Sequence, residues 1–231
     1  MANEKQLTPE EIGQAVTMLI RNLRVDEPAE RSRSRDEIAN DRRLRDEEAL
    51  RADSEARRQR IVESVLKGVV PPKLYGLITG RPFHTPAAKI ALDWWEDGPR
   101  LCVLRGPMSV GKSAAAALVC KHAAEHGKRS ISWHRPDEFV SAVLHDYDPD
   151  APKLGRDLVV IDDMGRETKP SYAEALTSFL DNKVTRVLIT TNDLLLTWVQ
   201  RYDPRLLARM ADEGDAYDIV GEPLRQKGMG F

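Results

Sequence analysis

The sequence predicts an α/β fold, a doubly wound parallel sheet of about five strands with helices on both faces, preceded by a charged helical N-terminal segment. From about residue 76, apolar segments alternate with segments of helical periodicity. The apolar segments are continuous runs of valine, isoleucine and leucine, which is typical of strands buried on both faces. A change of composition at Pro71-Pro72 divides the chain into two expected regions, residues 1–70 and 71–231.

The second region reads as strand and helix in turn. The expected strands are residues 101–105, 130–133, 158–161, 184–190 and 217–220. The expected helices are residues 86–95, 112–126, 137–147, 172–180, 194–202 and 205–211. Helices between consecutive strands allow those strands to run parallel.

The N-terminal region begins with a predicted amphipathic helix. Residues 8–11, Thr-Pro-Glu-Glu, form a capping box with proline at the first helical position. An apolar stripe follows, made of Ile12, Ala15, Val16, Leu19 and Leu23. Because an isolated helix of this length is marginal in water, the stripe packs either on the chain's own body or on another protein. We expect residues 1–30 to bind a partner and to be dispensable for catalysis.

Residues 31–60 are dense in arginine, aspartate and glutamate. Opposite charges four residues apart, such as Asp41 with Arg45, favour a solvated helix that serves as a spacer. A nucleic-acid-binding arm is the alternative, but acidic residues nearly balance the basic ones. Apolar residues from Ile61 to Leu66 then indicate a helix end that returns to the core.

Composition excludes several classes of protein. With 41% hydrophobic residues the chain can build a core, so full disorder is excluded. Lys and Arg total 35 against 37 Asp and Glu, a net charge of -2, so DNA contact requires a local basic patch. Cys102 and Cys120 are too few for a disulfide framework or a four-cysteine zinc site. No apolar run is long enough to span a membrane, and we expect a cytoplasmic protein.

A phosphate-binding loop follows the strand at 101–105. The segment fits the pattern G-x-x-x-x-G-K-[ST] and opens a predicted helix, so its backbone N–H groups and the helix N-terminus favour phosphate. Lys112 can reach the β- and γ-phosphates of ATP, and the Ser113 hydroxyl can ligate Mg²⁺. The loop consists of Gly106, Pro107, Met108, Ser109, Val110, Gly111, Lys112 and Ser113.

Two carboxylates follow the buried strand at 158–161. In a doubly wound sheet the carboxyl end of this strand lies on the same side as the phosphate loop. We therefore expect Asp162 to hold Mg²⁺ and Asp163 to act as the base or water-orienting group for attack on the γ-phosphate.

Further candidates come from the last third of the chain. The strand at 184–190 ends in the sequence Thr190-Thr191-Asn192. The amide of Asn192 can point toward the attacking water. Arg205 and Arg209 lie four residues apart on one helix face. They either cover apolar surface with their stems or reach a neighbouring subunit's γ-phosphate as arginine fingers.

Residues 76–231 resemble the AAA+ ATPases of the DnaC and IstB class, which are bacterial and phage helicase loaders and transposition helper ATPases. The resemblance rests on four motifs in the family order: GPMSVGKS at 106–113, LVVIDDMG at 158–165, ITTN at 189–192 and RLLARM at 205–210. It implies a P-loop NTPase of AAA+ type that uses ATP and Mg²⁺ and acts in DNA replication as a DnaC-like helicase loader.

The resemblance also implies roles and partners. Asn192 would be the sensor-1 residue, Arg209 the trans-acting finger, Arg205 its helper, and Arg225 the arginine after the last strand. The implied partners are a replicative helicase, further copies of the chain and, as a further candidate, single-stranded DNA. Asp163 stands where most AAA+ enzymes carry glutamate, which indicates slow hydrolysis, and the DNA-gripping helix of loader ATPases is shortened or missing.

Other functions remain open at this level. The chain could be an IstB-like transposition helper, a small P-loop kinase or a nucleotide-gated adaptor with little turnover. The kinase is the weakest of these, because the arginines lie beyond the fourth strand rather than in a lid over the phosphates. The five histidines form no metal cluster in the sequence, and Trp94-Trp95 is expected to pack in the core.

Overall fold

The computed structural model describes residues 35–80, 84–144, 154–182 and 185–221, together with residues 10, 13, 14 and 18. The chain divides into two compact units, residues 1–54 and 55–231. The apolar stripe expected in residues 12–23, and Arg225, lie outside the described residues. In the described part, no helix has the length and apolar character required to cross a membrane.

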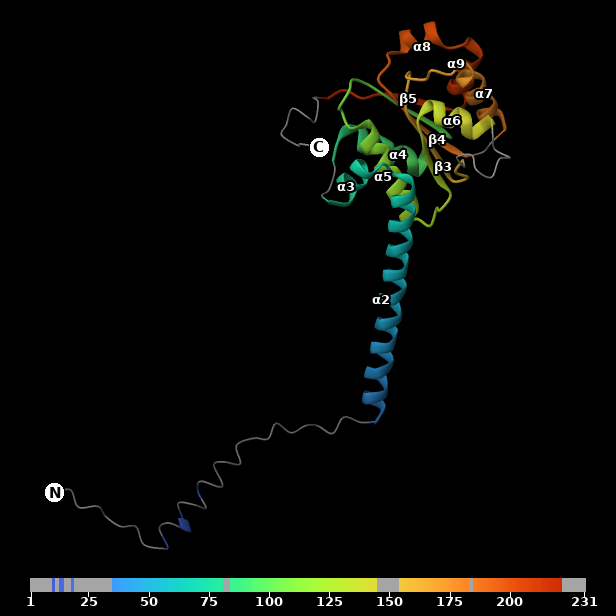
Figure 1. Ribbon diagram of the computed structural model, residues 1–231. Helices are drawn as coiled ribbons and strands as arrows, with labels where there is room; N and C mark the ends of the chain where they lie inside the picture. Colours follow the sequence, from blue (N-terminus) through green and yellow to red (C-terminus); the bar gives the residue numbers. More distant parts are fainter. Residues whose placement is uncertain are drawn as a thin grey trace, which may run out of the picture. The chain divides into compact units, whose positions relative to one another are not determined.

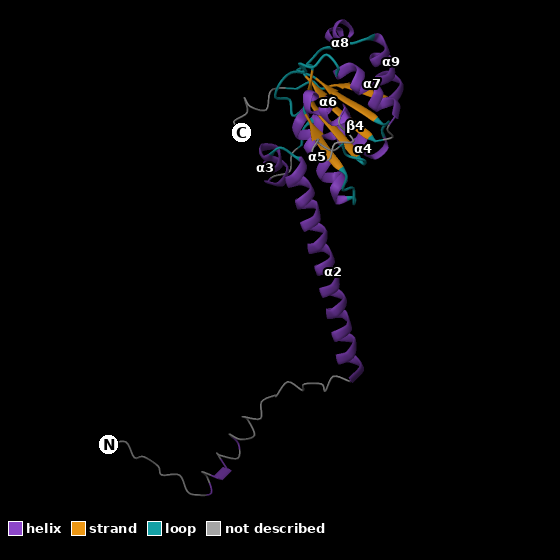
Figure 2. Ribbon diagram, turned by 45° about the vertical axis from the view of Figure 1, so that its right-hand side comes forward, coloured by secondary structure: helices purple, strands orange, loops and turns teal. Residues whose placement is uncertain are grey.

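The second unit is built on a parallel sheet, which confirms the predicted fold class (Figures 1 and 2). Within the described residues the sheet has five strands in the order β2-β3-β4-β1-β5, and every neighbouring pair is parallel. The strands are β1 (Leu101–Arg105), β2 (Ile131–His134), β3 (Leu158–Met164), β4 (Arg186–Thr191) and β5 (Gly214–Asp218). The phosphate loop therefore leaves a strand near one end of the sheet, and β4 separates that strand from β3.

Helices cover both faces of this sheet (Figure 2). Side chains alternate along each strand, so β1 sends Cys102 and Leu104 into one core cluster and Leu101 and Val103 into the other. The first cluster packs against α3 (Pro72–Gly80), α4 (Pro86–Asp97) and α5 (Lys112–Glu125). The second packs against α6 (Pro136–Leu144), α7 (Tyr172–Asn182), α8 (Leu195–Arg201) and α9 (Pro204–Glu213).

One strand differs from its predicted position. The sequence places the last strand at 217–220, whereas β5 begins at Gly214. Only β1 pairs with β5, at the edge of the sheet, and its residues Gly-Asp-Ala-Tyr-Asp are half-buried or exposed. Because β5 is not buried on both faces, it lacks a continuous apolar pattern, and the residue at which it begins cannot be recognised from the sequence.

A long helix, α2 (Arg35–Val69), agrees with the predicted charged helix. Most of its described side chains up to residue 60 are exposed, and Arg43 pairs with Glu47 at 3.5 Å. Its last turns differ, because Leu66 is buried in the first core cluster and Val62 and Val65 pack against it. The expected return of the chain to the core at 61–66 is confirmed.

The tryptophan pair at the end of α4 is part of the core, as predicted. Trp94 and Trp95 are buried, and the guanidinium of Arg186 lies 4.5 Å and 4.9 Å from their ring centroids. Arg186 also donates hydrogen bonds to the backbone carbonyls of Trp94 and Trp95, at 2.6 Å each. These contacts join α4 to the first residue of β4.

Candidate nucleotide-binding site

The phosphate loop connects β1 directly to α5. Gly111 has a left-handed backbone, with φ at 94°, and stands at the N-cap of α5. No side chain caps this helix end, so its first backbone N–H groups are available to an anion. The structure therefore has the strand, loop and helix context that the motif requires.

Lys112 is the first residue of α5 and points back over the loop. Its Nζ donates to the carbonyl oxygens of Gly106 at 2.8 Å and Pro107 at 2.7 Å, and to Oδ1 of Asn192 at 2.9 Å. Burial lowers the pKa of Lys112, while the carboxylates of Asp163 and Asp162 act in the opposite direction. The three oxygens that accept from Nζ are uncharged, so a phosphate group near Nζ would place a negative charge in direct contact with the ammonium.

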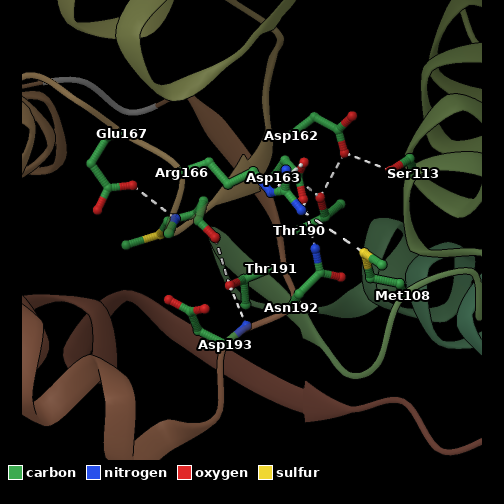
Figure 3. A network of polar contacts seen from close by, with 12 residues as sticks. Met108, Ser113, Asp162, Asp163, Arg166, Glu167, Thr190, Thr191, Asn192 and Asp193 are labelled. Atoms are coloured by element: carbon green, nitrogen blue, oxygen red, sulfur yellow. Dashed lines mark hydrogen bonds and ion pairs between the residues drawn. The ribbon is translucent and has the colours of Figure 1, made fainter.

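Asp162 brings β3 to the phosphate loop (Figure 3). Its Oδ1 accepts hydrogen bonds from the Ser113 hydroxyl at 2.7 Å and the Thr190 hydroxyl at 2.6 Å. Burial raises the pKa of Asp162, and these two hydrogen bonds partly offset that effect. A carboxylate beside a hydroxyl is an oxygen donor set that suits Mg²⁺, which typically takes one or two carboxylates together with substrate phosphates.

Asp163 lies at an irregular end of β3. The strand register shifts between Ile161 and Met164, and Asp163 has φ at 70°. Its backbone N–H donates to the Thr190 hydroxyl at 3.0 Å. The carboxylates of the two adjacent acids have different partners, Ser113 and Thr190 for Asp162 and Asn192 and Arg166 for Asp163, so they can take different roles.

Two groups hold the Asp163 carboxylate. Asn192 donates from Nδ2 to its Oδ1 at 2.8 Å, and Arg166 Nε lies 3.2 Å from its Oδ2 (Figure 3). Since Asn192 also accepts from Lys112, one amide joins the lysine of the phosphate loop to the candidate base. The structure thus brings together the predicted residues Lys112, Ser113, Asp162, Asp163 and Asn192.

Sequence reasoning assigned no role to Thr190 or Arg166, although both contact the acidic pair. Thr190 was recognisable only as a hydroxyl at the end of a buried strand beside Asn192. Arg166 had no signal beyond its place three residues after Asp163. In the part of the chain that the structure describes, no three His, Cys, Asp or Glu side chains gather as a metal cluster.

The two candidate finger arginines lie on α9. Arg209 Nε is 2.6 Å from Oδ1 of Asp181 on α7, and their side chains are 40% and 39% exposed. Arg205 is exposed. Within its own chain, Arg209 is thus engaged with Asp181 and not with residues 106–113. The trans-acting roles of both arginines stay predictions.

Comparisons with known proteins complete the description of the site. A scan against protein-family models finds no match, and a search of curated proteins finds none either. A solved DNA replication initiation factor is 14% identical over 58% of this chain and 45% of that chain, with a TM-score of 0.46. The chain thus spans less than half the length of that protein.

Two shorter solved proteins are covered more fully. A putative primosome component from Streptococcus pyogenes is 18% identical over 59% of this chain and 79% of that one, with a TM-score of 0.47. DnaI is 15% identical over 69% of this chain and 92% of that one, with a TM-score of 0.45.

Proposed function

We propose that this chain is an ATP- and Mg²⁺-dependent AAA+ ATPase that acts in DNA replication as a DnaC-like helicase loader. One observation carries the ATPase assignment. Residues at the carboxyl ends of three strands form a single polar network. Lys112 of the phosphate loop contacts Asn192, and Ser113 contacts Asp162. Asn192 in turn contacts Asp163. This is the set of groups that phosphoryl transfer from ATP to water requires.

Separate groups in the site bind the triphosphate, hold the cation and accept the proton. The loop amides at 106–111 and the Lys112 ammonium bind the triphosphate, and Ser113 and Asp162 would hold the cation. When bound, Mg²⁺ neutralises charge on the β- and γ-phosphates. The Asp163 carboxylate accepts the proton of the attacking water. Asn192 fixes this carboxylate by donating a hydrogen bond from Nδ2 to Oδ1 of Asp163. Arg166 Nε lies 3.2 Å from the other carboxylate oxygen, Oδ2.

The replication role rests on the four motifs in the order of the helicase-loader class. The proposed partner is a replicative helicase, and further copies of the chain complete the site through Arg209. A transposition helper has the same ATPase site and differs only in its partner. Purified full-length chain that binds its organism's replicative helicase in the presence of ATP supports the loader, whereas binding to a transposase instead supports the helper.

The ATPase assignment is tested with two substitutions in the full chain. Lys112→Ala should abolish tight ATP binding and hydrolysis, because charge neutralisation at the β- and γ-phosphates contributes on the order of several kcal/mol to the transition state. Asp163→Asn should retain binding and lose about a hundredfold or more in kcat, because a general base contributes that factor. The measurements are phosphate release with Mg²⁺ and equilibrium binding of a fluorescent ATP analogue.

Lys128→Ala is the matched control, since Lys128 is 51% exposed and lies 3.9 Å from Asp157, away from the site. It should behave as the unsubstituted chain. Near-normal turnover of Lys112→Ala would overturn the phosphate-loop assignment. Collapse of nucleotide affinity in Asp163→Asn would show that Asp163 holds the cation instead of serving as base. Phosphate that appears on a metabolite rather than in solution would identify a kinase.

A further inference from the structure

A second polar network ties together the chain segments that follow Asp163 and Asn192. The Thr191 hydroxyl donates to the carbonyl of Met164 at 2.7 Å and accepts from the backbone N–H of Asp193 at 3.0 Å (Figure 3). Thr191 is fully buried. Met164 directly follows Asp163, and Asp193 directly follows Asn192, so this network begins one residue beyond the candidate catalytic pair.

Arg201 extends the network from the last residue of α8. Its Nη1 donates to the carbonyl of Gly165 and, at 3.2 Å, to Oδ2 of Asp193. The guanidinium therefore bridges the segment after β3 and the segment after β4. The bridge adds charge-assisted hydrogen bonds to the link that Thr191 already makes between these two segments.

Glu167 contacts both Arg201 and Gly165, the two residues that the bridge joins. Its side chain is 9% exposed, and it lies 3.7 Å from Arg201 Nη1. Its Oε2 accepts from the backbone N–H of Gly165 at 2.8 Å, and its Oε1 accepts from the Tyr202 hydroxyl at 2.5 Å. Burial and the Glu167 carboxylate raise the pKa of Tyr202, so the phenol stays protonated and donates.

Gly165 is required for this close approach. Its φ is 101°, a left-handed conformation, and a Cβ at this position would collide with the carboxylate of Asp193. The segment after β3 can therefore lie against the segment after β4 only with glycine here. The same turn places Asp163 two residues before the bridge.

We propose that Arg201, Glu167 and Asp193 form a clamp that positions the Asp163 carboxylate against Asn192 for attack on ATP. The clamp rests on the proposed ATPase function and deepens it. None of its side chains contacts the phosphate loop in the described structure, so all three are positioning residues. By holding the loops together, they maintain the 2.8 Å hydrogen bond from Asn192 to Asp163. A small displacement of a reacting group costs a large factor in rate while leaving substrate binding intact.

The test uses Arg201→Gln in the full chain, with Gln200→Ala as the control from the same exposed turn of α8. Arg201→Gln should lower kcat about tenfold or more and leave the affinity for ADP within about twofold. Affinity for ADP with aluminium fluoride, which mimics the transition state, should fall by a factor similar to that in kcat. Arg201→Lys keeps one charged donor and should recover part of the loss.

A second readout needs no nucleotide. The backbone N–H of Asp163 and of Asp193 donate to threonine hydroxyls, so loosening of the two loops should accelerate their hydrogen exchange in Arg201→Gln and not in Gln200→Ala. Asp193→Asn is the alternative variant if Arg201→Gln fails to fold, and it should show the same pattern because it weakens the other end of the bridge.

The outcomes separate this inference from the proposed function. An unsubstituted chain that hydrolyses no ATP overturns the proposed function and the clamp together. If the unsubstituted chain hydrolyses ATP while Arg201→Gln and Asp193→Asn match the control in kcat, only the clamp is overturned. Equal losses in ADP affinity and transition-state-analogue affinity also overturn the clamp, because they indicate a general structural defect.

Discussion

At the scale of single residues, Asp162 shows how the site balances stability against function. Asp162 is partly buried, and its carboxylate accepts hydrogen bonds from the hydroxyls of Ser113 and Thr190. Burial raises its pKa, so the ionised form that a cation requires is held at a cost in folding free energy. Residues selected for ligand binding commonly carry such a cost.

Asp162→Asn should therefore stabilise the ligand-free protein at neutral pH while abolishing Mg²⁺-dependent hydrolysis. A gain of about 1 kcal/mol corresponds to a rise in Tm of roughly 2–4 °C for a chain of this size. The measurements are thermal unfolding without nucleotide and phosphate release with Mg²⁺. A lower Tm for the variant at neutral pH would contradict this account of the burial cost.

The pH dependence follows from the direction of the shift. Because the folded pKa of Asp162 lies above its unfolded value, acidification through the folded pKa protonates the carboxyl and relieves the cost. The Tm difference between Asp162→Asn and the unsubstituted chain should thus be present at neutral pH and vanish on acidification.

At the scale of elements, α2 belongs to both compact units. The sequence suggested a boundary near residue 70, whereas the structure divides the chain between Ser54 and Glu55, inside the helix. The last turns of α2 bury Leu66 in the same core cluster as α3, α4 and α5, and Val70 follows directly. These turns are part of the hydrophobic core of the second unit, although the helix begins as a solvated one.

A fragment of residues 55–231 should fold with nearly the stability of the full chain, whereas a fragment of residues 71–231 should be several kcal/mol less stable. Burial of each large aliphatic side chain contributes roughly 1.5–3 kcal/mol, and the shorter fragment lacks Leu66 and Val70. Urea unfolding of both fragments measures the difference. Equal stability would show that the end of α2 contributes nothing to the core.

At the scale of the whole molecule, the question is whether one chain contains a complete site. The described residues place Lys112, Asp163 and Asn192 together, but Arg209 pairs with Asp181 on the outer helices. An arginine that contributes to the γ-phosphate site from this position must do so in a second copy of the chain. Self-association is therefore a consequence of the predicted role of Arg209.

Mixing two inactive variants tests this consequence. Lys112→Ala chains retain the finger and Arg209→Ala chains retain the phosphate loop, so interfaces between them combine both and should recover up to about a quarter to a half of normal turnover per chain. The activity of the unsubstituted chain should also rise with protein concentration. Absence of recovery at every mixing ratio would confine Arg209 to its own chain.

The amino-acid sequence predicted the alternating α/β fold, which the structure confirms, and it predicted that Asp162 and Asn192 lie beside the phosphate loop, where the structure has them. The roles of these residues stay predictions. Each of these signals lies within a few consecutive residues, because glycine placement, a buried strand and the polar residue that ends it are all local properties. The end of α2 was recognisable for the same reason. The edge strand β5 was not placed correctly, since its half-exposed residues carry no apolar pattern.

The side chains that surround these local motifs could be identified only from the folded chain. The hydroxyl of Thr190 meets Asp162, and Arg201 meets Gly165 and Asp193, because β3 and β4 are neighbours and α8 returns to the ends of both strands. Strand order and helix return depend on packing free energy summed over the whole sheet. Contacts between residues far apart in the chain leave no local pattern, so the groups that position the candidate catalytic pair emerge only once the chain has folded.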